Sequence, residues 1–89
     1  MTDSEIRDAI LDGLARIAPE ADLASLDPKA NLRAALDLDS FDFLRFLIEL
    51  GEATGVEVPE ADYGCVTTLE TMSEYITKAA RGRGQRGRD

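Results

Sequence analysis

Residues 40–54 form the most hydrophobic stretch of the chain, and they constrain the fold more than any other feature. Their spacing predicts a helix with a wide arc of core-facing side chains: Phe43, Leu44, Phe46, Leu47 and Leu50. Phe41 and Ile48 fall on a different face, beside Arg45 and Glu52. A chain of 89 residues cannot bury one helix on all sides. We therefore expect one face to pack on the core and the other to bind a partner.

The ends of this helix are marked by residues that favour helix termini. Asp39 or Ser40 can cap the amino end, because a short polar side chain there accepts a hydrogen bond from a free backbone amide. Asp42 lies in the first turn, where the helix dipole favours negative charge. Gly55 follows the last turn and is well placed to stop the helix.

The amino-terminal segment predicts another helix. Thr2 and Glu5 have the spacing of a capping box, so this helix begins at about Asp3. Ala18 precedes a proline, a position that disfavours helical conformation, and ends the helix. Its apolar residues recur every three or four positions and define one face: Ile6, Ile10, Leu14 and Ile17.

The carboxyl-terminal part predicts a third long helix. Residues 56–59 are extended, and residues 60–63 form a single helical turn. Thr67 and Glu70 have the spacing of a second capping box and open the last helix, which runs to about Ala80. Its apolar stripe is Leu69, Met72, Ile76 and either Ala79 or Ala80.

The connection over residues 19–39 has two interpretations. Its leucines are too many for a solvated linker: Leu23, Leu26, Leu32 and Leu36. Asp27-Pro28 could open a short helix with residues 29–36 as its body. The alternative, which we favour, is a long ordered loop whose leucines tuck under the bundle. The chain thus predicts an all-α four-helix bundle over residues 1–80, with a long loop after the first helix and a short third helix. A disordered basic tail is predicted over residues 81–89.

Acidic side chains outnumber basic ones by 18 to 10. Four of the arginines lie in the last nine residues, so residues 1–80 hold 17 acidic and 6 basic side chains, a net charge of −11. Such a body repels nucleic acid and anionic membranes and attracts basic protein surfaces. We therefore expect protein partners with a basic docking surface, no nucleic acid partner and no insertion into membranes.

Several kinds of site are excluded by composition. The absence of histidine removes the commonest general base, and a single cysteine, Cys65, allows neither an intrachain disulfide nor a cysteine-rich zinc site. No apolar run approaches the roughly 20 residues that span a bilayer, and the acidic amino terminus lacks the pattern of a signal peptide. We expect a cytoplasmic monomer that is not an enzyme.

The acidic cluster around Ser40 has an ordinary structural explanation, in which Ser40 is a helix cap and the aspartates complement the dipole. A catalytic serine would need an adjacent base, and neither lysine of the chain has a motif spacing to it. A calcium loop starting at Asp37 would need an oxygen ligand, a glycine and a glutamate where the chain has Phe41, Asp42 and Ile48. No metal site is predicted.

The setting of Ser40 adds a resemblance. Asp39-Ser40-Phe41 resembles the Asp-Ser-Leu signature of acyl carrier proteins at the start of their second helix. The similarity covers about residues 3–80. Further segments look like the family's at matching spacings: residues 31–36, 56–60, 66–69 and 75–76.

The resemblance implies a covalent 4′-phosphopantetheine arm on Ser40, attached from coenzyme A by a phosphopantetheinyl transferase and carrying its cargo as a thioester. It implies that Asp39 is recognised by the transferase. Phe41, Asp42, Arg45 and Ile48 become partner-facing positions. The phosphodiester would lie beside a helix amino terminus, where partial positive charge favours an anion.

Three residues depart from the family's usual pattern: Asp37 where many members have glycine, Phe41 where leucine is usual, and Arg45 where glutamate is common. Leu38-Asp39-Ser40-Phe41 is also similar to the signature of D-alanyl and other aminoacyl carriers. These departures predict a specialised carrier, loaded by an acyl or aminoacyl ligase or transferase, rather than the general carrier of fatty-acid synthesis. A long acyl chain would need a cavity between the helices, and Phe41, Phe43 and Phe46 are expected to fill that space, which favours short or polar cargo. An unmodified, carrier-like interaction module is the alternative.

Overall fold

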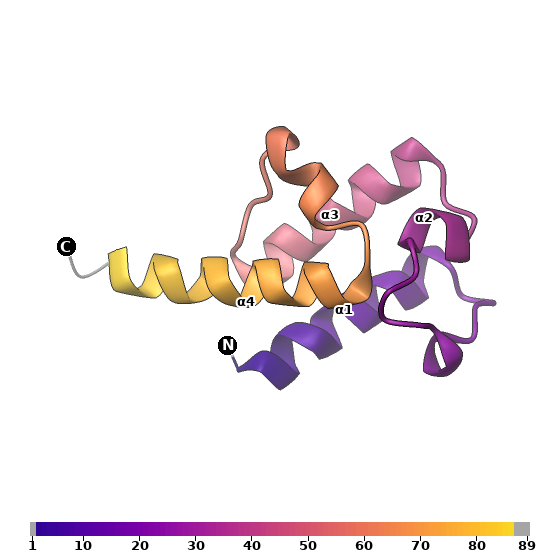
Figure 1. The fold of residues 1–89 in the computed structure, drawn as a ribbon, viewed down its shortest axis with the longest axis horizontal. Helices are drawn as coiled ribbons and strands as arrows, with labels where there is room; N and C mark the ends of the chain where they lie inside the picture. Colours follow the sequence, from indigo (N-terminus) through magenta and orange to yellow (C-terminus); the bar gives the residue numbers. More distant parts are fainter. Residues whose placement is uncertain (1, 87–89) are drawn as a thin grey trace.

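Three long helices and three short ones make up the part of the chain that the structure describes (Figure 1). The structure is a computed structural model that describes residues 2–86, with side chains for residues 2–81. In chain order the helices are α1 (Asp3–Ile17), η1 (Leu23–Ser25), α2 (Leu32–Ala35), α3 (Ser40–Thr54), η2 (Glu60–Cys65) and α4 (Leu69–Arg86). Within residues 2–86, pairing of the β type is limited to one isolated bridge between Asn31 and Thr68. The predicted all-α fold is confirmed.

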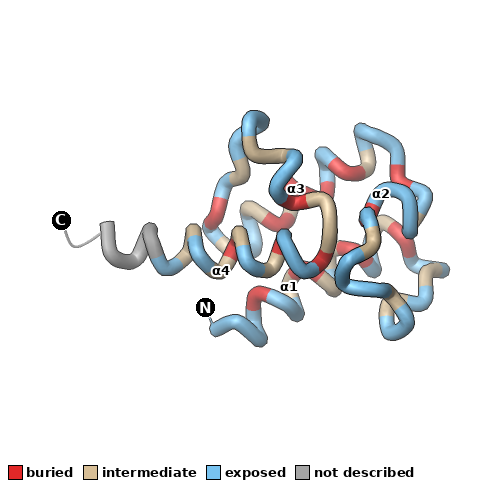
Figure 2. Tube along the Cα trace, viewed as in Figure 1, coloured by how far each residue is buried: buried red, intermediate tan, exposed pale blue. Residues whose placement is uncertain are grey.

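The core lies where α1 packs against both α3 and α4. The two later helices run roughly opposite to α1, and buried positions line the facing sides of all three (Figures 1 and 2). The predicted apolar faces meet there. The side chains that are completely buried include Ile6, Ile10, Leu14, Phe46, Met72 and Ile76. Burial of this apolar surface is the main source of stability for the bundle.

Local signals place α1 where the sequence predicts it. Thr2 and Glu5 form the predicted capping box, with the Glu5 amide donating to the Thr2 Oγ1 at 3.1 Å and the Thr2 amide donating to the Glu5 carboxylate at 2.8 Å. The hydrogen bond from the Thr2 backbone lowers the pKa of Glu5. The helix ends before Ala18, as expected.

The bounds of α3 also follow the prediction. Its amino-terminal cap is Asp39, and its carboxyl-terminal cap is Gly55 in the left-handed conformation at φ 76°. Leu44 was predicted to lie in the core, and this is wrong: 38% of its surface is exposed. Leu44 lines an open hollow together with Arg33 of α2 and Tyr63 of η2, which explains why its side chain is not covered.

Both predicted ends of α4 need correction. The cap is Thr68 rather than Thr67: its Oγ1 accepts from the Thr71 amide at 3.1 Å, and the Thr68 amide donates to the Thr71 hydroxyl at 3.3 Å. The helix continues to Arg86, beyond the predicted end at Ala80. Each residue added to an existing helix gains a hydrogen bond, which offsets the weak helix propensity of the glycines there. The rest of the predicted tail, residues 87–89, lies outside the described residues.

The connection between α1 and α3 combines the two interpretations of the sequence. It is mainly loop, but α2 provides one turn of helix, capped by Asn31 rather than by Asp27. The loop is fastened to the start of α4, because the Leu32 amide donates to the Thr67 carbonyl at 2.8 Å and the Glu70 amide donates to the Pro28 carbonyl at 2.9 Å. Leu32 is fully buried. This fastening holds α2 in place beside the amino end of α3.

None of the helices in residues 2–86 combines the length and the apolar character needed to cross a bilayer.

Candidate functional site

A tight turn joins α2 to α3 and sets the geometry of the site. Asp37 has a left-handed backbone with φ 54°, and the Leu38 amide donates to the Arg33 carbonyl at 2.9 Å. This is the pattern of a Schellman motif, whose left-handed residue is usually glycine. Asp37 therefore occupies a backbone position that glycine adopts with less strain. Leu38 is buried and anchors the turn in the core.

Ser40 is the first residue of α3 and is exposed. Its Oγ accepts a hydrogen bond from Nη2 of Arg33 at 3.1 Å. The carboxylate of Asp39 accepts from the Asp42 amide at 2.8 Å, which satisfies one of the free donors at the helix end. Asp39, not Ser40, is therefore the cap, and the Ser40 hydroxyl is left facing solvent.

Two open hollows lie beside α3, and both include Tyr63 of η2 in their lining. The hollow that includes Ser40 has a volume of about 560 Å³ and is also lined by Arg33, Phe43 and Leu44, among others. The other hollow, of about 480 Å³, is lined by Leu47, Ile48, Gly51 and Val58, among others. The serine thus lines a shallow, partly apolar hollow of the surface.

The outer face of α3 carries a stripe of exposed apolar side chains. Phe41 is 80% exposed, Leu44 38% and Ile48 56%. Their spacing of three and four residues places them on one side of the helix, starting next to Ser40. The predicted exposure of Phe41 and Ile48 is found, and Leu44 joins them. An apolar stripe of this kind on a small protein is typical of a protein-binding surface.

Arg45 lies beside this stripe on a flank of mixed charge. A shallow pocket there is formed by Arg16 of α1 with Asp42, Arg45 and Glu49 of α3. Arg45 is exposed and Asp42 is half-buried. The structure therefore brings all the predicted partner-facing residues to one region of α3.

Tyr75 and Asp62 fasten η2 to α4. The Tyr75 hydroxyl donates to the Asp62 carboxylate at 2.7 Å, and this bond raises the pKa of Tyr75 to about 12. Cys65 is exposed at the end of η2.

The described residues contain no cluster of acidic or cysteine side chains suited to a metal ion. The contact between Arg33 and Ser40 is the feature of the site that sequence reasoning missed. The two residues are seven positions apart and meet only because of the left-handed turn at Asp37. The basic charge at Arg33, next to a cluster of aspartates, was the only signal available in the sequence.

Residues 8–76 match the protein family described as the phosphopantetheine attachment site. The chain belongs to this family. Its curated relatives include the acyl carrier protein of Rubrobacter xylanophilus, 31% identical over 75 residues that cover 81% of this chain and 93% of that protein. The acyl carrier protein of Lactobacillus johnsonii is 32% identical over 77 residues, which cover 85% of this chain and 94% of that protein. The acyl carrier protein of Chlorobium luteolum is 28% identical over 79 residues, which cover 88% of this chain and 99% of that protein.

The resemblance drawn from the sequence is confirmed, and so is its cofactor. The chain is an acyl carrier protein of the phosphopantetheine-bearing kind, a carrier rather than an enzyme. The residues at the start of α3 fit the arm. Ser40 offers an exposed hydroxyl, the helix end favours an anion, and the Arg33 guanidinium lies at hydrogen-bond distance.

Proposed function

We propose that Ser40 is the residue that carries the 4′-phosphopantetheine arm. The observation that supports this most strongly is its position, exposed at the first turn of α3 within the matched region. In the transfer, the Ser40 Oγ forms a bond to the phosphorus of the pantetheine phosphate. The pyrophosphate bond of coenzyme A breaks, adenosine 3′,5′-bisphosphate leaves, and the hydroxyl proton passes to a base of the transferase. Ser40 needs no base of its own, which fits a chain without histidine.

Asp39 then has two roles in this proposal. It caps α3 through the Asp42 amide, and its exposed carboxylate is the group that the transferase recognises beside the serine. Only one carboxylate oxygen is engaged by the cap, so the other remains available to a metal ion or a cationic group of the transferase.

The partners in loading are acyl or aminoacyl ligases or transferases that bind the stripe of Phe41, Leu44 and Ile48 and meet Arg45 at its edge. The acidic body attracts basic enzyme surfaces, whereas Arg45 repels a surface built to meet glutamate at that position. We infer a specialised pathway rather than general fatty-acid synthesis, served by a cytoplasmic monomer.

The cargo is proposed to be short or polar. Phe43 and Phe46 are buried and pack with their ring centroids 6.3 Å apart in the interior of the bundle. Phe41 has no part in this filling, since it is exposed. The hollows near Ser40 are open to solvent, which suits a group that keeps contact with water.

The attachment is tested by intact mass spectrometry after incubation with coenzyme A, magnesium and a broad-specificity phosphopantetheinyl transferase. We expect the protein to gain the mass of one phosphopantetheine and Ser40→Ala to gain none. A folded protein that gains no mass with several transferases would instead favour the unmodified interaction module.

The docking surface is tested by loading the phosphopantetheine-bearing protein with its native ligase. Phe41→Ala and Arg45→Glu should each lower kcat/KM, because Phe41 is exposed next to Ser40 and Arg45 is exposed at the edge of the same stripe. Arg7→Glu makes the same charge change at an exposed position of α1 and is the matched control. Unchanged loading of both α3 variants would show that the partner binds elsewhere.

The cargo is tested by purifying the protein from its source and releasing the thioester with hydroxylamine. Short acyl or aminoacyl hydroxamates are expected. Long-chain acyl products would contradict the proposal about cargo and leave the attachment site unaffected.

A further inference from the structure

The contact between Arg33 and Ser40 is unusual for its surroundings. Asp37, Asp39 and Asp42 all lie within three residues of the serine, so the start of α3 is strongly acidic. Arg33 is brought into this acidic region by the turn between α2 and α3, and its Nη2 donates to the Ser40 Oγ at 3.1 Å.

A neutral hydroxyl makes poor use of a guanidinium. Arginine is always charged and presents several N–H donors in a planar fork that matches a phosphate. With the serine unmodified, the structure gives this fork one hydrogen bond at the site, to a neutral oxygen. The geometry is better suited to an anion attached at the same atom.

Attachment of the arm places that anion within reach. The phosphorus bonds to the Ser40 Oγ, so the non-bridging oxygens lie two bonds from an atom that Arg33 already contacts. The ester oxygen becomes a weaker acceptor, and the negative charge moves to those oxygens. The guanidinium can follow the charge by a small rotation of its exposed side chain.

The helix end alone is poorly placed to hold this phosphate. The Asp42 amide, one of the free donors of the first turn, is already bound by the Asp39 carboxylate at 2.8 Å. The neighbouring carboxylates repel a further negative charge. A cation at the position of Arg33 compensates for both effects.

We propose that Arg33 is a positioning residue for the prosthetic group: it binds the phosphodiester on Ser40 and fixes the direction in which the arm leaves the protein. The inference rests on the proposed attachment at Ser40. The direction matters because Arg33 and Ser40 both line the hollow that also includes Phe43 and Leu44. An arm held by Arg33 starts at that hollow.

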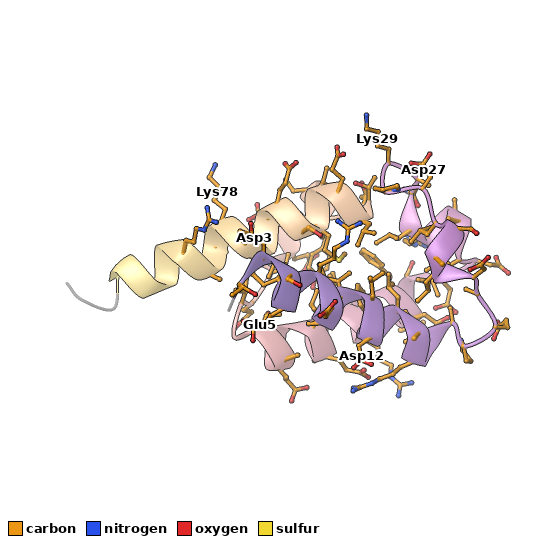
Figure 3. All side chains as sticks on the ribbon, turned by 90° about the horizontal axis from the view of Figure 1, so that it is seen from below. Asp3, Glu5, Asp12, Asp27, Lys29 and Lys78 are labelled. Carbon is orange, nitrogen blue, oxygen red and sulfur yellow. The ribbon has the colours of Figure 1, made fainter. Side chains whose placement is uncertain are left out.

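The test is a thermodynamic cycle on the protein with and without its arm. Melting temperatures of both forms are measured for the wild type, Arg33→Gln, Arg33→Lys and the control Lys29→Gln. Lys29 is an exposed cation of the same connection and projects away from the body (Figure 3). The arm is expected to raise the melting temperature of the wild type by about 2–6 °C more than it raises that of Arg33→Gln. This is the size expected of one exposed charge-assisted hydrogen bond in a small domain.

Arg33→Lys should recover part of this difference, since it keeps the charge and loses the fork. Lys29→Gln should show the same effect of the arm as the wild type. A second measurement needs no variant: the side-chain NMR signals of Arg33 should shift on attachment of the arm, whereas those of Arg7 should not.

The outcomes separate the two proposals. If mass spectrometry finds no arm on Ser40, the proposed attachment is wrong and the role of Arg33 is wrong with it. If the arm is attached but Arg33→Gln and Lys29→Gln respond to it equally, and the Arg33 signals do not move, only the role of Arg33 is overturned.

Discussion

Asp39 combines a structural and a recognition role, and two substitutions separate them. Asp39→Ala removes the hydrogen bond to the Asp42 amide, worth about 1 kcal/mol for a helix cap, and a charge at the helix amino end, worth about 0.3–1 kcal/mol. Asp39→Asn keeps an oxygen that can accept the same bond and loses only the charge. We expect free energies of unfolding lower by about 1–2 kcal/mol for alanine and by less than about 1 kcal/mol for asparagine.

Thermal unfolding followed by circular dichroism measures the difference, since about 1 kcal/mol corresponds to roughly 4–8 °C in a domain of this size. The transferase supplies the second readout. Both variants lack the carboxylate, so both should lower kcat/KM for attachment of the arm by at least about tenfold. Equal destabilisation by the two variants would refute the capping argument. Wild-type rates for Asp39→Asn would refute recognition of the charge.

Asp37→Gly should raise the free energy of unfolding by about 0.5 kcal/mol, because relief of the strained left-handed backbone at φ 54° exceeds the entropy cost of glycine. Urea denaturation tests this, and a lower free energy of unfolding would contradict it. Gly13→Ala should lower the free energy of unfolding by about 1 kcal/mol in the same assay. The added Cβ would lie 2.8 Å from the ring of buried Phe46, and this overpacking outweighs the better helix propensity of alanine. A more stable variant would show that the ring can move. The pKa of Tyr75 is raised to about 12 by its bond to Asp62, so the bond's contribution is complete below pH about 10 and is lost as the pH rises toward 12. Tyr75→Phe should therefore be less stable than the wild type by about 1 kcal/mol at neutral pH. Above pH 10 its free energy of unfolding should fall less steeply with pH than that of the wild type, as measured by urea denaturation. If the two proteins lose stability equally over this pH range, the bond between Tyr75 and Asp62 does not contribute to stability.

The sequence predicts the long helices well because their signals are local. The start of α1 is marked by Thr2 and Glu5, which lie three residues apart and bond to each other. The two ends of α3 are marked separately, by Asp39 at the start and by Gly55 at the end, each bonded to a residue nearby in the chain. Periodic apolar residues then identify the faces that pack together. The same reasoning found the exposed positions on α3, since a short chain cannot cover the whole helix.

The parts that were missed depend on the surroundings of each residue. Leu44 has the same apolar character as its buried neighbours, but it lines an open hollow whose position depends on the packing of α2 and η2 around α3. Thr67 and Thr68 are adjacent and chemically alike, so local pattern does not choose between them as the cap. The contact of Arg33 with Ser40 depends on one left-handed residue, which no periodicity encodes.

The fastening of the connection to the start of α4 has a consequence for attempts to recombine carriers. Residues 28–40 position the serine, yet they are held by backbone bonds to Thr67 and Glu70 and by packing in a core shared with Val66. A chimaera that takes residues 28–54 from this chain and the rest from a distant relative would separate the segment that carries the serine from the residues at the start of α4 that hold it in place. Successful grafts should therefore transfer residues 66–70 together with the first segment, although more than ten residues of chain lie between them.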